Sequence, residues 1–142
     1  IKVMNLARAI SIAAVGFEKV FDKAGSPYIL HCLRVMDKMD TDEEKIVAIL
    51  HDTIEDGVCT LKDLIDEHFG TDVIYALILL THKERDSYDE YIKKIAGDKL
   101  ATKVKLADLK DNSDITRLKG LTKKDFDRIE KYHRSYVYLS KI

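Results

Sequence analysis

The chain has 142 residues, and its 24 Lys and Arg residues are nearly balanced by 25 Asp and Glu, so its formal net charge is −1. This balance argues against a nucleic-acid-binding protein, whose surface is usually strongly basic. The chain also contains no apolar run close to the roughly 18 residues that a membrane span requires, because Arg8 and Glu18 limit the apolar N-terminal stretch. We therefore expect neither a nucleic acid nor a membrane as partner.

A chain of this length is expected to form a single domain, residues 1–142, that needs no disulfide or structural metal to fold. The two cysteines, Cys32 and Cys59, lack the CxxC spacing and suit a reducing compartment, so the predicted location is the cytoplasm. The first residue is Ile rather than Met, which suggests that the numbering begins inside a longer protein.

Helix-start signals divide the chain, which contains only one proline and six glycines. Ser26 before Pro27 predicts a helix start. Four capping boxes predict others, namely Thr41 with Glu44, Thr60 with Asp63, Ser87 with Glu90, and Thr122 with Asp125. The expected helices cover residues 5–23, 27–39, 42–56, 61–69, 72–82, 88–97, 99–118 and 123–141. The pattern predicts an all-α bundle of about eight helices, although the apolar run 73–80 alone also fits a buried strand.

The segment HDTIED, residues 51–56, follows an apolar run and gathers one imidazole and three carboxylates. On a helix, His51, Asp52, Glu55 and Asp56 would share one broad face. Desolvating that face would be costly unless a cation or a tight hydrogen-bond network absorbed its negative charge. For these residues alone, a divalent metal site and a solvated helix end are both open.

Two other segments strengthen the metal hypothesis. His31 lies among apolar residues in PYILHCLRVM, where a lone histidine is more often a hydrogen-bonded core residue than a ligand. In KLADLKDN, residues 105–112, a polar stripe lies on an otherwise apolar helix and is expected to border a cleft. The combined candidate metal set is His31, His51, Asp52 and Asp108. Two imidazoles and two carboxylates suit Mn²⁺, Fe²⁺ or Zn²⁺ and can leave positions open for water and substrate.

In this order, the motifs resemble those of HD-domain phosphohydrolases, specifically the hydrolase domains of the RelA/SpoT family and the small alarmone hydrolases. GSPYILH is similar to their GxPYxxH segment, HDTIED to HDxxED, and KLADLKDN to KLADxxxN, and the resemblance covers nearly the whole chain. It implies an all-α bundle holding one Mn²⁺ through His31, His51, Asp52 and Asp108. The implied reaction is removal of the 3′-pyrophosphate of guanosine tetraphosphate or pentaphosphate.

The resemblance also implies roles for residues around the ion. The acidic pair that matches Glu55 and Asp56 positions or activates the attacking water. The residues that match Lys105 and Asn112 lie around the metal and the nucleotide. From the residues alone, Lys105 is open between contacting a phosphate and covering apolar surface with its head in solvent.

Two further residues are candidates for substrate binding. Lys23 matches the lysine of an Arg-Lys pair that contributes to the family's nucleotide-base pocket. Tyr28 can stack on a base or be structural, since it lies beside Pro27 at an expected helix start.

Departures from the family pattern bear on the substrate. Asp22 takes the place of the arginine in the Arg-Lys pair. Where many relatives have AHxGQ, this chain has Phe17, Lys19 and Val20 at the places of the histidine, glycine and glutamine, and Cys32 replaces a proline. These changes spare the metal set and touch its surroundings. A hydrolase for a different nucleotide or phosphate ester therefore stays open, as does a non-catalytic regulatory module that binds metal or nucleotide.

The C-terminal segment leaves two questions open. Residues 117–134 are locally basic, which fits a solvated helix pair or a surface that draws polyphosphates to the cleft. Tyr132, Tyr136 and Leu139 recur at helical spacing, as expected for core or for the contact of a homo-oligomer. The partner that the family resemblance implies is a small nucleotide substrate.

Overall fold

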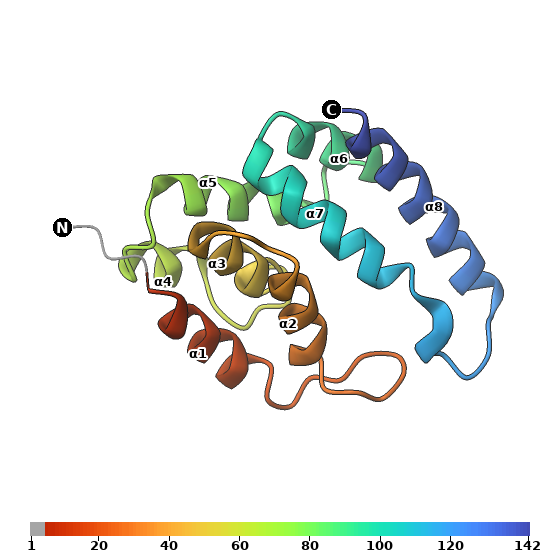
Figure 1. Ribbon diagram of the computed structural model, residues 1–142, viewed down its shortest axis with the longest axis horizontal. Coiled ribbons are helices and arrows are strands. Elements are labelled where there is room, and N and C mark those ends of the chain that lie inside the picture. Colours follow the sequence, from red (N-terminus) through yellow and green to blue (C-terminus); the bar gives the residue numbers. More distant parts are fainter. Residues whose placement is uncertain (1–4) are drawn as a thin grey trace.

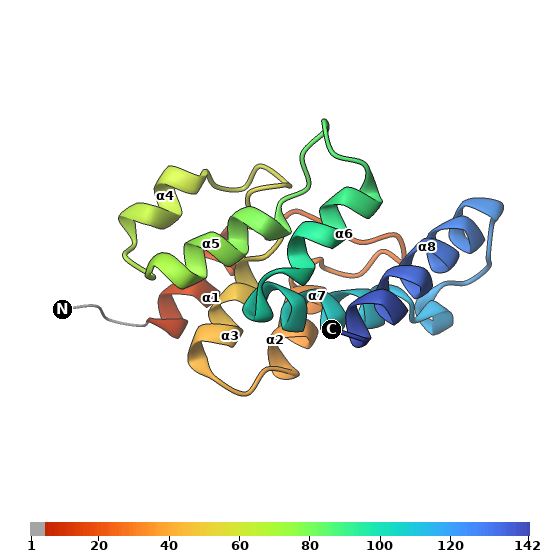
Figure 2. The same ribbon diagram turned by 90° about the horizontal axis from the view of Figure 1, so that it is seen from above.

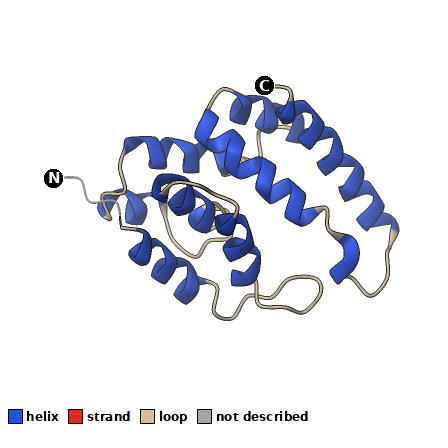
Figure 3. Cartoon of the chain, viewed as in Figure 1, coloured by secondary structure: helices blue, strands red, loops and turns tan. Residues whose placement is uncertain are grey.

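A computed structural model describes residues 5–142, which form helices joined by loops and contain no strand (Figures 1 and 3). The α-helices are α1 Leu6–Gly16, α2 Ile29–Asp37, α3 Asp42–Leu50, α4 Leu61–Asp66, α5 Thr71–Leu80, α6 Tyr88–Ala96, α7 Lys99–Asn112 and α8 Lys123–Ser140, and a 3₁₀ turn covers Ile115–Arg117. The all-α prediction is therefore confirmed, and the ambiguous run 73–80 is helical. Residues 1–4 of the expected domain lie outside the described part.

All four predicted capping boxes are formed, at the starts of α3, α4, α6 and α8. In the first, the Glu44 backbone N–H donates to the Thr41 hydroxyl, and the Thr41 N–H donates to the Glu44 carboxylate, both across 3.2 Å. These reciprocal bonds satisfy amides that have no partner within the helix.

The predicted cap at Ser26 is wrong, because α2 begins at Ile29. The carboxylate of Asp22 instead accepts the N–H groups of Ala24 and Ser26, each at 2.9 Å. This pattern, in which an Asp side chain folds the next few residues into a turn, is common in loops. Residues 22–26 are thereby held in a turn ahead of the helix.

Three predicted helices end at least six residues earlier than expected. The helix expected over 5–23 ends at Gly16, that over 42–56 at Leu50, and that over 99–118 at Asn112. Side chains that bond back to the preceding turn mark two of these ends: the Thr53 hydroxyl donates to the Leu50 carbonyl at 2.7 Å, and the Ser113 hydroxyl to the Leu109 carbonyl at 2.7 Å. Such local bonds compete with helical ones.

Helix α3 lies at the centre of the fold. Its last five residues, 46–50, have no exposed surface, and the helix packs against α1, α2, α5 and α7. Helix α8 lies along α7 and also contacts α6, on the far side of α7 from α3 (Figures 1 and 2). The end of α3 and the middle of α7 are thus brought together inside the bundle.

The end of α1 supports the loop that follows HDTIED. A Cβ atom added to Gly16 would lie only 3.0 Å from the Cβ of Val58, closer than an ordinary van der Waals contact, so glycine favours this close approach. Within residues 5–142, no helix is both long and apolar enough to cross a lipid bilayer.

Candidate metal centre and adjoining cleft

The four predicted metal residues meet in the interior. His31 comes from α2, His51 and Asp52 from the end of α3, and Asp108 from α7, and one ligand atom of each lies within 4.8 Å of those of the others. The Oδ1 atom of Asp108 is 2.9 Å from His31 Nε2 and 3.1 Å from His51 Nε2. The Oδ2 atom of Asp52 is 3.0 Å from His51 Nε2.

The two imidazoles are oriented by hydrogen bonds at Nδ1, the ring nitrogen that faces away from the cluster. Nδ1 of His51 donates to the Ala48 carbonyl at 2.6 Å, and a carbonyl can only accept, so this nitrogen carries a proton. Nδ1 of His31 donates to the carboxylate of Asp111 at 2.6 Å. Both Nε2 atoms therefore point at the carboxylates, and in the neutral rings they would present lone pairs to them.

This arrangement requires positive charge between the rings and the carboxylates. Although burial lowers the pKa of His51, Asp52 and Asp108 outweigh it and raise that pKa well above its usual value. The pKa of His31 is also raised, because its bonds to Asp108 and Asp111 outweigh burial. A divalent cation could replace these two protons and bind the same lone pairs. The donor set thus fits a divalent metal site.

Asp108 is the more deeply buried of the two carboxylates in the cluster. Burial raises its pKa, but Lys105, followed by His51, outweighs this and holds that pKa well below its usual range. The ammonium of Lys105 donates to Asp108 Oδ2 at 2.8 Å, and Lys105 is only 8% exposed. The ammonium also lies 5.2 Å from the centre of the Tyr91 ring. The interpretation of Lys105 as a lysine with its head in solvent is therefore wrong.

Tyr28 lies between the cluster and the N-terminal loop. Its hydroxyl donates to Oδ2 of Asp52, and its ring centre is 5.4 Å from that of His31. On its other side, its ring centre lies 5.1 Å from that of Phe17, which is fully buried. Phe17, at the family's histidine position, thus packs behind a residue that orients Asp52.

The acidic pair does not continue α3 as predicted, because HDTIED lies on turns after Leu50. Asp56 lines the cleft described below, and burial, followed by the nearby Asp52 and Glu55, raises its pKa to about 6. Both acids are exposed residues, but the Glu55 carboxylate accepts the backbone N–H of His82 at 2.8 Å. The two acids therefore have different surroundings.

A cleft of about 520 Å³ adjoins the metal cluster, since His31 forms part of its wall. Of the predicted substrate residues, Lys23, Tyr28 and Asn112 line it, whereas Lys105 does not. Asn112 also donates to Asp108 Oδ1 at 3.1 Å. Five cationic or aromatic lining residues were not singled out individually as substrate contacts, namely Phe21, Arg34, Arg117, Arg128 and Tyr132, although the last three lie in the basic segment 117–134.

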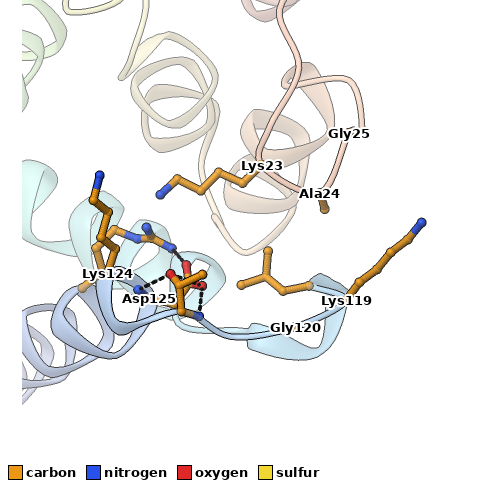
Figure 4. Close-up of a pocket in the computed structure, with 10 residues that line it drawn as sticks. Lys23, Ala24, Gly25, Lys119, Gly120, Lys124 and Asp125 are labelled. Carbon is orange, nitrogen blue, oxygen red and sulfur yellow. Dashed lines mark hydrogen bonds and ion pairs between the residues drawn. The ribbon is translucent and has the colours of Figure 1, made fainter.

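A second, more basic pocket of about 570 Å³ borders this cleft, and Lys23, Ala24, Leu118 and Arg128 line both (Figure 4). Lys119 and Lys124 belong to it as well. Its acidic residue, Asp125, accepts hydrogen bonds from Thr122 and Arg128. The cluster thus opens onto a basic surface, as expected for a phosphorylated ligand.

Comparisons with known proteins give a consistent family resemblance. No protein-family model matches the chain. The chain is 32% identical to a GTP pyrophosphokinase of Myxococcus xanthus and 33% identical to a guanosine-3′,5′-bis(diphosphate) 3′-pyrophosphohydrolase of Aquifex aeolicus, each over 63% of this chain. The chain spans 14% of the length of each of these curated relatives.

A solved structure shares the fold. It is described as a metazoan ortholog of SpoT that hydrolyzes ppGpp, and it matches with a TM-score of 0.76 at 22% identity, over 94% of this chain and 84% of that one. The sequence and fold comparisons together confirm the resemblance to the RelA/SpoT type of HD-domain hydrolase.

Proposed function

We propose that the chain is a metal-dependent phosphohydrolase that removes the 3′-pyrophosphate of guanosine tetraphosphate or pentaphosphate, with Mn²⁺ as its ion. The observation that carries the proposal is the cluster of His31, His51, Asp52 and Asp108 at the wall of a cleft with several cationic side chains. The name of the Aquifex aeolicus relative supports the choice of substrate.

In this proposal the four clustered side chains would bind the ion, and neighbouring groups orient these side chains. The Ala48 carbonyl and Asp111 fix the two rings so that Nε2 faces inward. Tyr28 orients Asp52, and Lys105 neutralises the second oxygen of Asp108. When bound, a divalent ion lowers the pKa of a water molecule and offsets charge on phosphoryl oxygens.

The reaction needs a proton acceptor, for which we propose Asp56. The oxygen of water attacks the phosphorus nearest the ribose, the bond from that phosphorus to the 3′-oxygen breaks, and pyrophosphate leaves. Asp56 accepts one proton of the water, the displaced ribose 3′-oxygen takes a proton from solvent to become a hydroxyl, and Asp56 then returns its proton to solvent. In the metal-free fold the pKa of Asp56 is raised to about 6, and a carboxylate whose pKa lies near the working pH is suited to accept a proton.

Substrate contacts follow from the lining of the cleft. Lys23, Arg117 and Arg128 offer positive charge to phosphates, and Tyr132 offers a ring for the base. The matched family role of Lys23 supports this assignment. We also propose that residues 1–142 act as one hydrolase domain and that the chain works in the cytoplasm.

The test is release of pyrophosphate from guanosine tetraphosphate by the purified chain with Mn²⁺, followed by product analysis. We expect turnover, and we expect chelation of the metal to abolish it. Asp108→Asn should lose both the bound metal and the turnover. A panel of other nucleotides and phosphate esters is the necessary comparison, because Asp22 replaces the arginine of the family pair. Turnover confined to another substrate would disprove the substrate, and bound metal with no turnover on any would favour a regulatory module.

A further inference from the structure

We propose that Arg34 and Arg117, both held by Asp111, form a phosphate-binding clamp beside the metal cluster. The inference rests on the proposed phosphohydrolase function and adds a binding site to it. The ligand class is a phosphate group of the substrate or product.

Asp111 is the centre of the arrangement. It lies on α7, one turn after Asp108, and is only 7% exposed. Its Oδ1 accepts Nε of Arg34 at 2.8 Å, and its Oδ2 accepts Nη2 of Arg34 at 3.1 Å, so the pair is bidentate. Its backbone carbonyl accepts Nη2 of Arg117 at 3.0 Å. One buried residue thus fixes two guanidinium groups that come from different segments.

The same two arginines reach the cleft. Both line it, and their side chains are 34% and 31% exposed. Asp111 occupies Nε and Nη2 of Arg34, and no hydrogen bond is made by its Nη1 within residues 5–142. Among the residues that the structure describes, Nη1 of Arg117 makes one long bond, of 3.3 Å, to Asp114. A guanidinium with a fixed plane and donors to spare is well suited to binding phosphate oxygens.

Two acids near the clamp, Asp22 and Asp114, each bond with one oxygen to the backbone of their own turn. The Asp22 carboxylate accepts two backbone amides of its own turn. Oδ1 of Asp114 accepts the Thr116 backbone N–H at 3.0 Å. These bonds occupy one oxygen of each carboxylate, while Oδ2 of Asp114 still accepts Nη1 of Arg117 at 3.3 Å. The clamp also supplies cations to the cleft in which Asp22 stands at the place of the family's arginine.

Asp111 also couples the clamp to the metal cluster. Its Oδ2, which accepts Arg34 Nη2, accepts Nδ1 of His31 at 2.6 Å. His31 and Arg34 lie three residues apart on α2 and so project from neighbouring positions on one face. Asp111 is therefore a positioning residue both for a candidate metal ligand and for the guanidinium beside it.

The experiment titrates inorganic phosphate into the Mn²⁺-loaded chain by calorimetry, at measured metal occupancy. We expect Arg34→Gln and Arg117→Gln each to weaken phosphate binding about 10-fold, the loss typical of a charge-assisted hydrogen bond, with a smaller loss of Mn²⁺ affinity than in Asp111→Asn. Arg134→Gln is the matched control, because Arg134 is also paired with carboxylates but lies outside the cleft lining. Asp111→Asn should weaken phosphate binding and also lower Mn²⁺ affinity about 10- to 100-fold.

Phosphate affinity in both arginine variants equal to that of Arg134→Gln would overturn the clamp, as would a wild-type chain that binds no phosphate. Arg34→Lys, which keeps the charge but loses the bidentate geometry, should bind phosphate with intermediate affinity. Circular dichroism melts establish that each variant is folded. If guanosine tetraphosphate is not hydrolysed but the arginine variants still lose phosphate affinity, the proposed substrate fails and the clamp stands.

Discussion

His31 and Asp111 join α2 to α7 through one hydrogen bond of 2.6 Å from Nδ1 to Oδ2. The bond lies directly behind the candidate metal cluster, on the side of the ring opposite to Asp108. His51 is fixed differently, by the Ala48 carbonyl of its own chain segment. One imidazole is thus oriented by tertiary structure and the other by local backbone.

Lys105→Met should destabilise the metal-free chain by roughly 3–5 kcal/mol, because it leaves the Asp108 carboxylate buried without its nearest cation. Mn²⁺ should raise the melting temperature more in this variant than in the wild type, since the ion compensates the same carboxylate. Thermal melts with and without a chelator measure both effects. Lys110→Met, at an exposed position of the same helix, is the control and should change neither. Equal responses of the two variants would contradict the role of Lys105.

Asp56→Asn should retain bound metal and lose turnover, because the amide cannot accept the proton of water. It should also change stability with a defined sign. In the metal-free fold the pKa of Asp56 is raised to about 6, so the wild type loses stability as the pH rises from the unfolded pKa of about 4 through 6. The variant should therefore melt at a higher temperature than the wild type at pH 7, and the difference should disappear in acid. Normal turnover would refute the assignment.

Glu55→Gln should act on activity through Asp56. The charge of Glu55 contributes to the raised pKa of Asp56, so its removal should lower that pKa and move the acid limb of the pH–rate profile to lower pH. The amide oxygen of the substituted side chain can still accept the His82 N–H, which keeps the loop in place. The measurement is the pH dependence of kcat/KM. An unmoved acid limb together with lost turnover would instead indicate that Glu55 itself handles the water.

Metal binding should release protons. The pKa values of His31 and His51 are raised in the metal-free fold, so their protonation stabilises it below the unfolded pKa of about 6.5, and this stabilisation is lost as the pH rises through the folded values. An ion needs both Nε2 atoms deprotonated, so Mn²⁺ affinity should rise with pH. Calorimetry in two buffers of different ionisation enthalpy counts the protons. His133→Gln, at an exposed position, should give the wild-type count, and a count of zero in the wild type would contradict this explanation.

The sequence was a good guide where structure is set locally. All four capping boxes form because each needs only residues three apart. Helix ends were harder to predict. The early end of α3 depends on Thr53 bonding back to Leu50, which competes with a helical pattern that would otherwise continue through Asp56.

The candidate metal set could be predicted because its members lie in recognisable motifs, even though these motifs are far apart in the sequence. Its supporting residues were missed for the opposite reason. Asp111 lies at a position that the KLADxxxN pattern leaves open, and Arg34 lies outside the recognised motifs. Their importance arises from the packing of α2 on α7. The spacing of Asp111, three residues after Asp108, was a usable signal, since residues at this spacing are neighbours on a helix surface.

The ligand atoms of the cluster come from α2, the end of α3 and α7, and therefore converge only once these three segments have docked. An ion that prefers the folded chain must stabilise it by mass action. Synthesis of the chain under metal limitation would then yield a larger unfolded fraction, open to proteases. Supply of the ion would in this way set the lifetime of the protein as well as its chemistry.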